Sequence, residues 1–206
     1  MTFESSKNLS AVGALLMVIG LAGTVIPYVG ILTLIGVILL LIGVKGLANF
    51  YTEQGIFNNA LYSIITAIVG GIVTIAAVAL SAVAAFASLG IDIATIEDWI
   101  ALGTDPTVIF AEFFNIDTFF ALIAAFVVGL LLLLVTLIIS MYFARKSMDQ
   151  LSTKSGIGLF GTAGLLMLIG AVLIIAVGIG LIIIWIGLIL ATVAFFQMKK
   201  PTSATA

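Results

Sequence analysis

Long apolar runs are the feature that most constrains the fold of this chain. Each has roughly 17 residues or more, and a helix rises about 1.5 Å per residue, so each can cross most or all of a hydrocarbon core of about 30 Å. Lipid offers no hydrogen-bond partners to the backbone, so such runs form helices or a closed barrel. Residues 130–139 lack the alternating pattern of barrel strands. We therefore predict an all-α, six-pass transmembrane helical bundle, with helices at 9–26, 31–47, 60–87, 119–143, 156–177 and 181–197.

The composition supports a membrane protein and excludes several kinds of chemistry. Of the 206 residues, 64% are hydrophobic and 8% are charged, which is too little polar surface for a soluble domain. The chain has no His and no Cys, so it lacks the commonest general base, the commonest metal ligand and any thiolate. Its net charge of -2 and the lack of a basic cluster argue against nucleic acid. We expect a single integral membrane domain over 1–206, with no catalytic residues, metal or cofactor.

An acidic segment, 91–118, divides the apolar runs into three before it and three after it. It contains no Lys or Arg and six of the nine acidic residues, namely Asp92, Glu97, Asp98, Asp105, Glu112 and Asp117. We predict that it lies on the outer face of the membrane and contains short interfacial helices, with aromatic side chains toward lipid and carboxylates toward water. A solvated connector and a binding site for a cation or a partner protein are both consistent with this pattern.

The basic residues predict the orientation of the chain in the membrane. Lys and Arg are concentrated in cytoplasmic loops of membrane proteins. In a six-pass path that starts inside, all seven basic residues fall on the cytoplasmic side: Lys7, Lys45, Arg145, Lys146, Lys154, Lys199 and Lys200. The sequence therefore predicts a multi-pass protein of the cell membrane with both termini in the cytoplasm.

The two ends of the chain resemble each other at a constant offset. Leu15, Leu16, Met17, Ile19, Gly20 and Gly30 recur as Leu165, Leu166, Met167, Ile169, Gly170 and Gly180. We interpret the bundle as three helical hairpins, of which the first and the last form a parallel repeat. Because the fifth run cannot be a signal peptide, its likeness to the first run indicates that the first run is retained.

Small residues recur at intervals of seven within most runs and predict the faces on which helices pack. Helices in lipid associate by close backbone approach, which Gly and Ala permit, and a period of seven favours left-handed packing at about +20°. The predicted helix-packing residues are Gly13, Gly20, Gly36, Gly43, Gly70, Ala77, Ala84, Ala163, Gly170, Gly180 and Gly187.

The polar groups within the runs are hydroxyls, since no charged residue lies at the centre of any run. They are Thr24, Thr33, Ser63, Thr66, Thr74, Ser81, Thr136, Ser140, Thr162 and Thr192. Such hydroxyls can bond back to carbonyls of their own helix. A channel or carrier for a neutral or lipid-like substrate is the alternative that they leave open.

One polar cluster is expected on the inner side. Asn58, Asn59 and Tyr62 precede or begin the third run, and they should face the same side as Arg145, Lys146 and Lys154. Together they could bind an anionic lipid head group or contact a partner. The alternative is that the Asn residues cap a helix while the cations mark topology.

Several short stretches carry a resemblance to a known family. They are Ile56-Phe57-Asn58-Asn59-Ala60-Leu61, Arg145-Lys146-Ser147, the run from Gly158 to Leu166, and Ala194-Phe195-Phe196. The chain resembles small multi-pass membrane proteins of unknown function found largely in archaea. That resemblance implies an archaeal or bacterial cell membrane and adds no activity.

We therefore expect a non-catalytic protein that serves as an assembly, accessory or membrane-organising component. Its expected partners are membrane lipids, other membrane proteins or further copies of itself, and it should not bind nucleic acid. This expectation depends on the many packing residues and on the lack of charge inside the runs.

Overall fold

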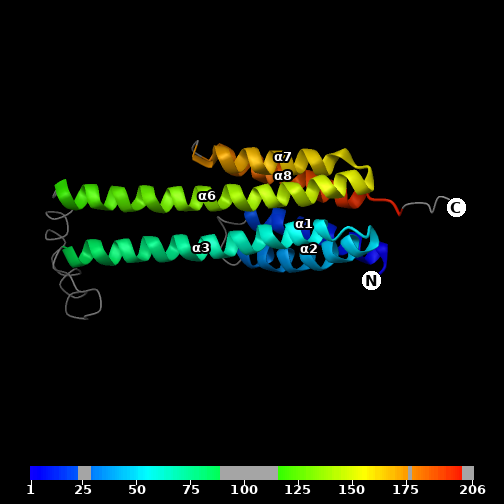
Figure 1. Ribbon diagram of the computed structural model, residues 1–206, viewed down its shortest axis with the longest axis horizontal. Helices are drawn as coiled ribbons and strands as arrows, with labels where there is room; N and C mark the ends of the chain where they lie inside the picture. The colour runs from blue at the N-terminus through cyan, green and yellow to red at the C-terminus, as the bar shows by residue number, and fades with distance from the viewer. Residues whose placement is uncertain (23–28, 89–115, 176–177, 201–206) are drawn as a thin grey trace. The chain divides into compact units, whose positions relative to one another are not determined.

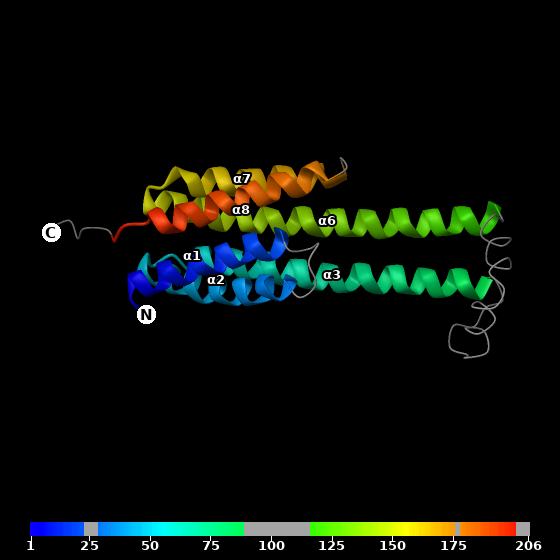
Figure 2. The same ribbon diagram turned by 180° about the vertical axis from the view of Figure 1, so that it is seen from behind.

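All regular structure in the described part of the chain is helical, which confirms the predicted all-α class. The computed structural model describes residues 1–22, 29–88, 116–175 and 178–200. In these ranges it has six α-helices and one 3-10 turn (Figures 1 and 2): α1 (Phe3–Ala22), α2 (Gly30–Phe50), α3 (Gln54–Ser88), α6 (Ile116–Ser155), α7 (Gly158–Val172), the 3-10 turn (Leu173–Ile175) and α8 (Ile179–Gln197).

Four of the described helices are long and apolar enough to cross a membrane. The stretches are Gly30–Phe50, Gln54–Ala84, Phe126–Ser155 and Ile179–Gln197, and α7 is a shorter apolar helix. The first turns of α1 hold the charged residues Glu4 and Lys7, and α1 is not among these four stretches. The membrane-like character is thus confirmed at this level, and the full set of six crossings stays a prediction.

Most of the helices extend beyond the predicted apolar runs, whereas α7 (Gly158–Val172) is shorter than the predicted helix 156–177 and passes into the 3-10 turn. α1 begins at Phe3 instead of residue 9, α3 begins at Gln54 instead of residue 60, and α6 continues to Ser155 instead of residue 143. Hydropathy marks where apolar surface stops, whereas a helix continues as long as its polar turns are solvated or bonded. At the start of α1, for example, the Thr2 hydroxyl accepts from the Ser5 N–H at 3.2 Å.

The acidic segment lies almost wholly outside the described residues. Asp92, Glu97, Asp98, Asp105 and Glu112 fall there, as do the predicted interfacial helices. Asp117 is within the first turn of α6. The outer-face assignment therefore stays a prediction.

The chain divides into two compact units, and the prediction of a single domain stays a prediction. Unit 1 comprises Met1–Ala67 and Leu137–Ala206, and unit 2 comprises Ile68–Thr136. Unit 1 thus contains α1, α2, α7 and α8, together with the start of α3 and the end of α6.

In unit 1, α1 packs on α2, α7 packs on α8, and α1 also contacts α8 (Figures 1 and 2). The core includes the buried rings of Phe160 and Phe195, whose centroids are 4.8 Å apart. Between α8 and α1, the Trp185 indole N–H donates to the Val18 carbonyl at 3.0 Å. These contacts bury one face of each short helix.

Glycine sets the spacing in both of these helix pairs. A Cβ on Gly36 of α2 would lie 2.6 Å from the Gly13 carbonyl oxygen and 2.9 Å from Met17 Cγ of α1. A Cβ on Gly187 of α8 would lie 3.0 Å from the Ala163 carbonyl oxygen and 2.9 Å from Met167 Cγ of α7. In each pair, a glycine of the second helix thus lies against two residues of the first helix. These two residues, Gly13 and Met17 in α1 and Ala163 and Met167 in α7, occupy the same positions of the proposed repeat.

The described residues of unit 2 are the second part of α3 and the first part of α6. A Cβ on Gly70 would overlap the Thr136 side chain, and one on Gly129 would lie 2.9 Å from Val78 Cγ2. Most of the large side chains point away from this contact, and Ile75 is 71% exposed. This apolar surface is suited to a hydrocarbon environment.

Candidate functional site

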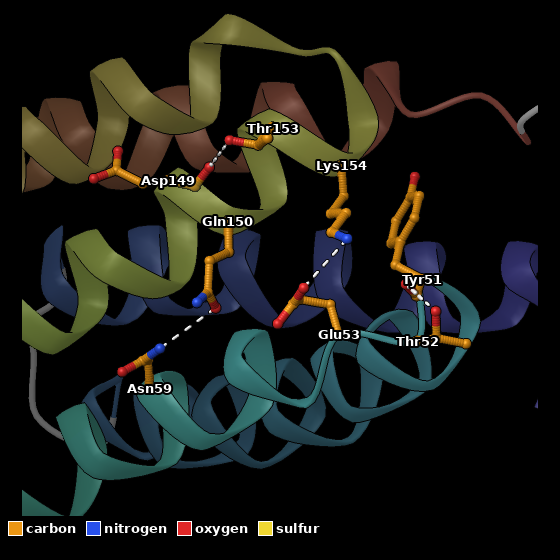
Figure 3. Close-up of polar contacts among 8 residues, drawn as sticks. All are labelled: Tyr51, Thr52, Glu53, Asn59, Asp149, Gln150, Thr153 and Lys154. Atoms are coloured by element: carbon orange, nitrogen blue, oxygen red, sulfur yellow. Dashed lines mark hydrogen bonds and ion pairs between the residues drawn. The ribbon is translucent and has the colours of Figure 1, made fainter.

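The predicted inner polar cluster is formed in unit 1, where α3 begins and α6 ends. A tight turn joins α2 to α3: Thr52 has a φ of 50°, in the left-handed region, and the Glu53 N–H donates to the Ala48 carbonyl at 2.9 Å. The turn places the Glu53 side chain toward the last turns of α6, as Figure 3 shows. A charged side chain can therefore reach the neighbouring helix.

Neutral hydrogen bonds join α3 to α6. The Ser147 hydroxyl donates to the Ile56 carbonyl at 2.7 Å, and the Ser140 hydroxyl donates to the Ser63 carbonyl at 2.9 Å. Asn59, 7% exposed, donates to the carbonyl of Gly55 at 2.7 Å and faces Gln150 Oε1 at 3.4 Å (Figure 3). Asn59 therefore lies inside α3 and does not cap its start.

Two of the three predicted cations have acidic partners. Lys154 Nζ is 3.2 Å from Glu53 Oε2 (Figure 3), and Arg145 Nε is 3.5 Å from Asp149 Oδ2. The four side chains are 35–49% exposed. Exposed pairs of this kind contribute about 0–1 kcal/mol. They orient the cations without burying them.

The remaining predicted residues, Asn58, Tyr62 and Lys146, are exposed. The Tyr62 ring of α3 meets the Phe143 ring of α6, with centroids 5.7 Å apart, and Phe143 also contacts Tyr142 at 5.7 Å. Tyr142 was not among the residues selected from the sequence. Its spacing of four from Lys146, which puts both on one helix face, is the signal that could have identified it.

A half-buried tyrosine, whose hydroxyl oxygen is buried, lies beside this cluster. Tyr51 follows α2, and its ring stacks edge-on against Phe3 and Phe50, with centroids 6.4 and 5.3 Å away. Among the described residues its hydroxyl has no hydrogen-bond partner. Burial raises the pKa of the Tyr51 phenol, because desolvation disfavours the phenolate.

The structure buries most of the predicted packing residues. Ala77 is half-buried and Ala84 is exposed, whereas the others are buried: Gly13, Gly20, Gly36, Gly43, Gly70, Ala163, Gly170, Gly180 and Gly187. Gly164 was missed, although Ala171 follows it at an interval of seven. A Cβ there would lie 2.9 Å from Arg145 Cα.

The predicted hydroxyls do not all behave alike, and the buried Thr74 hydroxyl has no hydrogen-bond partner among the described residues. Some bond back to their own helix as expected: Ser81 to Ala77, Thr136 to Leu132, Thr162 to Gly158 and Thr192 to Leu188. The Ser140 hydroxyl instead bonds across to the Ser63 carbonyl of α3. Thr24 lies outside the described residues. Within the described ranges, no three acidic side chains gather so as to hold a metal ion.

Comparison with known proteins gives a family and one relative. The profile of a family described as "Protein of unknown function (DUF996)" matches residues 32–189. "Uncharacterized protein MJ1644" of Methanocaldococcus jannaschii is 27% identical over 198 residues, which cover 96% of this chain and 94% of that protein. No solved structure matches the chain. The resemblance to a family of unknown function, with an archaeal relative, is confirmed.

Proposed function

Because this chain belongs to the DUF996 family of proteins of unknown function, we propose its function from its own geometry: a non-catalytic membrane protein that organises or assembles with other membrane components. Long helices with exposed apolar surface suit contact with lipid and with other helices. The absence of His and Cys from the sequence removes the usual nucleophile and base pairs.

The observation that carries this proposal is the exposed apolar surface of the long helices. Only 11% of the most apolar stretch within Gln54–Ala84 is buried inside the molecule, and the same holds for Phe126–Ser155. Gly71 adds a site for close approach, since nothing lies within 4 Å of a Cβ placed there. This surface is available to lipid and to helices of another chain.

We further propose six crossings in the cell membrane, with both termini cytoplasmic. The position of all seven basic residues supports this orientation. The chain lacks Cys, so single cysteines can be introduced without background. A cysteine in place of Asp105 should react with an impermeant maleimide on intact cells, and one in place of Thr153 should react only after lysis. The opposite pattern would refute the orientation.

The proposed role is tested by extracting the full chain in mild detergent and measuring what remains bound. We expect mass spectrometry to find a defined self-association or a constant membrane-protein partner. Gly71→Leu should weaken that association without unfolding the chain, because the added side chain points into open space. A strictly monomeric protein without protein partners would contradict the proposal.

A small carrier for a neutral or lipid-like substrate is the second candidate. The matched glycine contacts of the α1–α2 and α7–α8 pairs favour it, because many carriers are built from repeated helix groups. Gly30 and Gly180 are paired in the proposed repeat, but their surroundings differ. A Cβ on Gly30 meets nothing within 4 Å, whereas one on Gly180 would lie 2.6 Å from Ile174 Cα. Saturable solute movement into liposomes containing the purified protein would favour this candidate over the first.

A further inference from the structure

We infer that an exposed patch formed by Tyr62, Tyr142 and Lys146 binds the phosphate of an anionic lipid head group. The inference rests on the proposed insertion in a membrane. From the six-residue cluster it keeps Tyr62, which contacts Phe143, and Lys146, the cation without an acidic partner among the described residues, and it adds Tyr142.

The backbone brings the three side chains together. Tyr142 and Lys146 are four residues apart on α6 and therefore share one helix face. Phe143 lies between the two tyrosines, with both ring centroids 5.7 Å from its own. Tyr62 is 50% exposed and Tyr142 is 53% exposed. Two phenols and one ammonium group are thus held on adjoining helix surfaces.

The charge of this patch favours an anion. Within the described residues, no carboxylate lies at ion-pair distance from Lys146, whereas Arg145 and Lys154 have Asp149 and Glu53. The Asp149 charge is already matched by Arg145 at 3.5 Å. An ammonium group and two hydroxyl donors can together satisfy the oxygens of a phosphate ester.

The position of the patch favours a lipid over a free phosphate. Tyr62 lies near the start of the apolar run 60–87 and Tyr142 near the end of the apolar run 119–143. Aromatic rings at such run ends prefer the interface between lipid and water. The bound head group would keep its acyl chains along exposed apolar residues such as Ile65 and Ile139, 47% and 44% exposed. A soluble anion would gain nothing from that surface.

The experiment measures lipid retained by the full chain in native mass spectrometry. Phosphatidylglycerol is titrated against phosphatidylcholine of the same chain length. We expect Lys146→Gln to weaken phosphatidylglycerol binding about fivefold. The double variant Tyr62→Phe with Tyr142→Phe keeps both rings and should weaken it at least threefold, since it removes two donors to a charged group. Lys45→Gln is the matched control: Lys45 is exposed and its Nζ lies 5.6 Å from the Phe57 ring centroid. It should change binding by less than about twofold.

Three results would overturn the inference. Equal weakening by Lys146→Gln and Lys45→Gln would indicate diffuse surface charge. Equal binding of the two lipids would remove the requirement for an anion. Displacement of the lipid by millimolar glycerol phosphate would assign the patch to a free phosphate. An unchanged melting temperature shows that each variant is folded, and co-purification of the partner tests the proposed assembly role separately.

Discussion

The α1–α2 pair and the α3–α6 pair within unit 1 are held together in different ways. In α1–α2, backbone meets backbone: a Cβ on Gly13 would lie 2.7 Å from the Gly36 carbonyl oxygen and 2.9 Å from Leu40 Cα. In α3–α6, side chains bridge the helices, as Ser147 does to the Ile56 carbonyl. The α1–α2 contact depends on the absence of a side chain at glycine, and the α3–α6 contact depends on a hydroxyl donor.

This difference separates two sources of specificity in an apolar environment. Lipid tails are as apolar as Leu, so burial of Leu does not by itself select a partner helix. Close packing selects by shape and fails when a methyl group is added. A hydrogen bond selects by direction and fails when the donor is removed. The α7–α8 pair follows the first type, with Gly187 against Ala163.

The largest effect should come from a methyl group added to the glycine contact. Gly13→Ala should lower the free energy of unfolding by about 1–3 kcal/mol, because the backbone of α2 has to move away. The measurement is unfolding of the purified protein in mixed micelles. Alanine is the better helix former by up to about 1 kcal/mol, so the steric cost opposes a favourable propensity.

Gly71→Ala is the matched control for this substitution. Its added Cβ meets nothing within 4 Å in the same chain, so among the terms within one chain only helix propensity changes. This variant should be unchanged or more stable by up to about 1 kcal/mol. Equal destabilisation by the two variants would show that the effect does not come from helix contact.

A smaller effect is expected where a hydroxyl forms the contact. Ser147→Ala should lower the free energy of unfolding by about 1 kcal/mol, since it removes the bond to Ile56 and adds no volume. Thr153→Ala is the control, because the Thr153 hydroxyl is exposed and bonds to Asp149 in its own helix. That change should stay within about 0.5 kcal/mol. If both variants behaved alike, the hydroxyl bridge would not stabilise the pair.

The sequence predicted the shape-based contacts better than the polar ones. Glycine at intervals of seven identifies a helix face, and Gly13 and Gly36 do lie against each other. A serine hydroxyl can bond within its helix or across to another, and nothing in its neighbours decides which. The contacts of Ser140 and Ser147 with α3 therefore follow only from the packing of the two helices.

Helix ends and charge partners were predictable only in part, for a related reason. Apolar runs located the helices, but the polar turns up to Ser155 were missed because hydropathy does not register a solvated helix. Lys154 was identified as an inner cation. Its partner Glu53 lies about a hundred residues away in the sequence, so only the packing of α6 beside α3 brings them together.

The smallest effect is expected for the Glu53–Lys154 ion pair. It tests whether charge contributes to the stability of the α3–α6 contact. Glu53→Gln, Lys154→Gln and the double variant form a cycle whose coupling should be about 0.2–1 kcal/mol, because the side chains are 35% and 41% exposed. The coupling should fall further at 1 M salt, since the Debye length shortens to about 3 Å. A coupling energy well above about 1 kcal/mol that does not fall with salt would instead show that the ion pair stabilises the α3–α6 contact. The α1–α2 pair would then be held by close packing at glycine, and the α3–α6 pair by charge instead of by neutral hydrogen bonds.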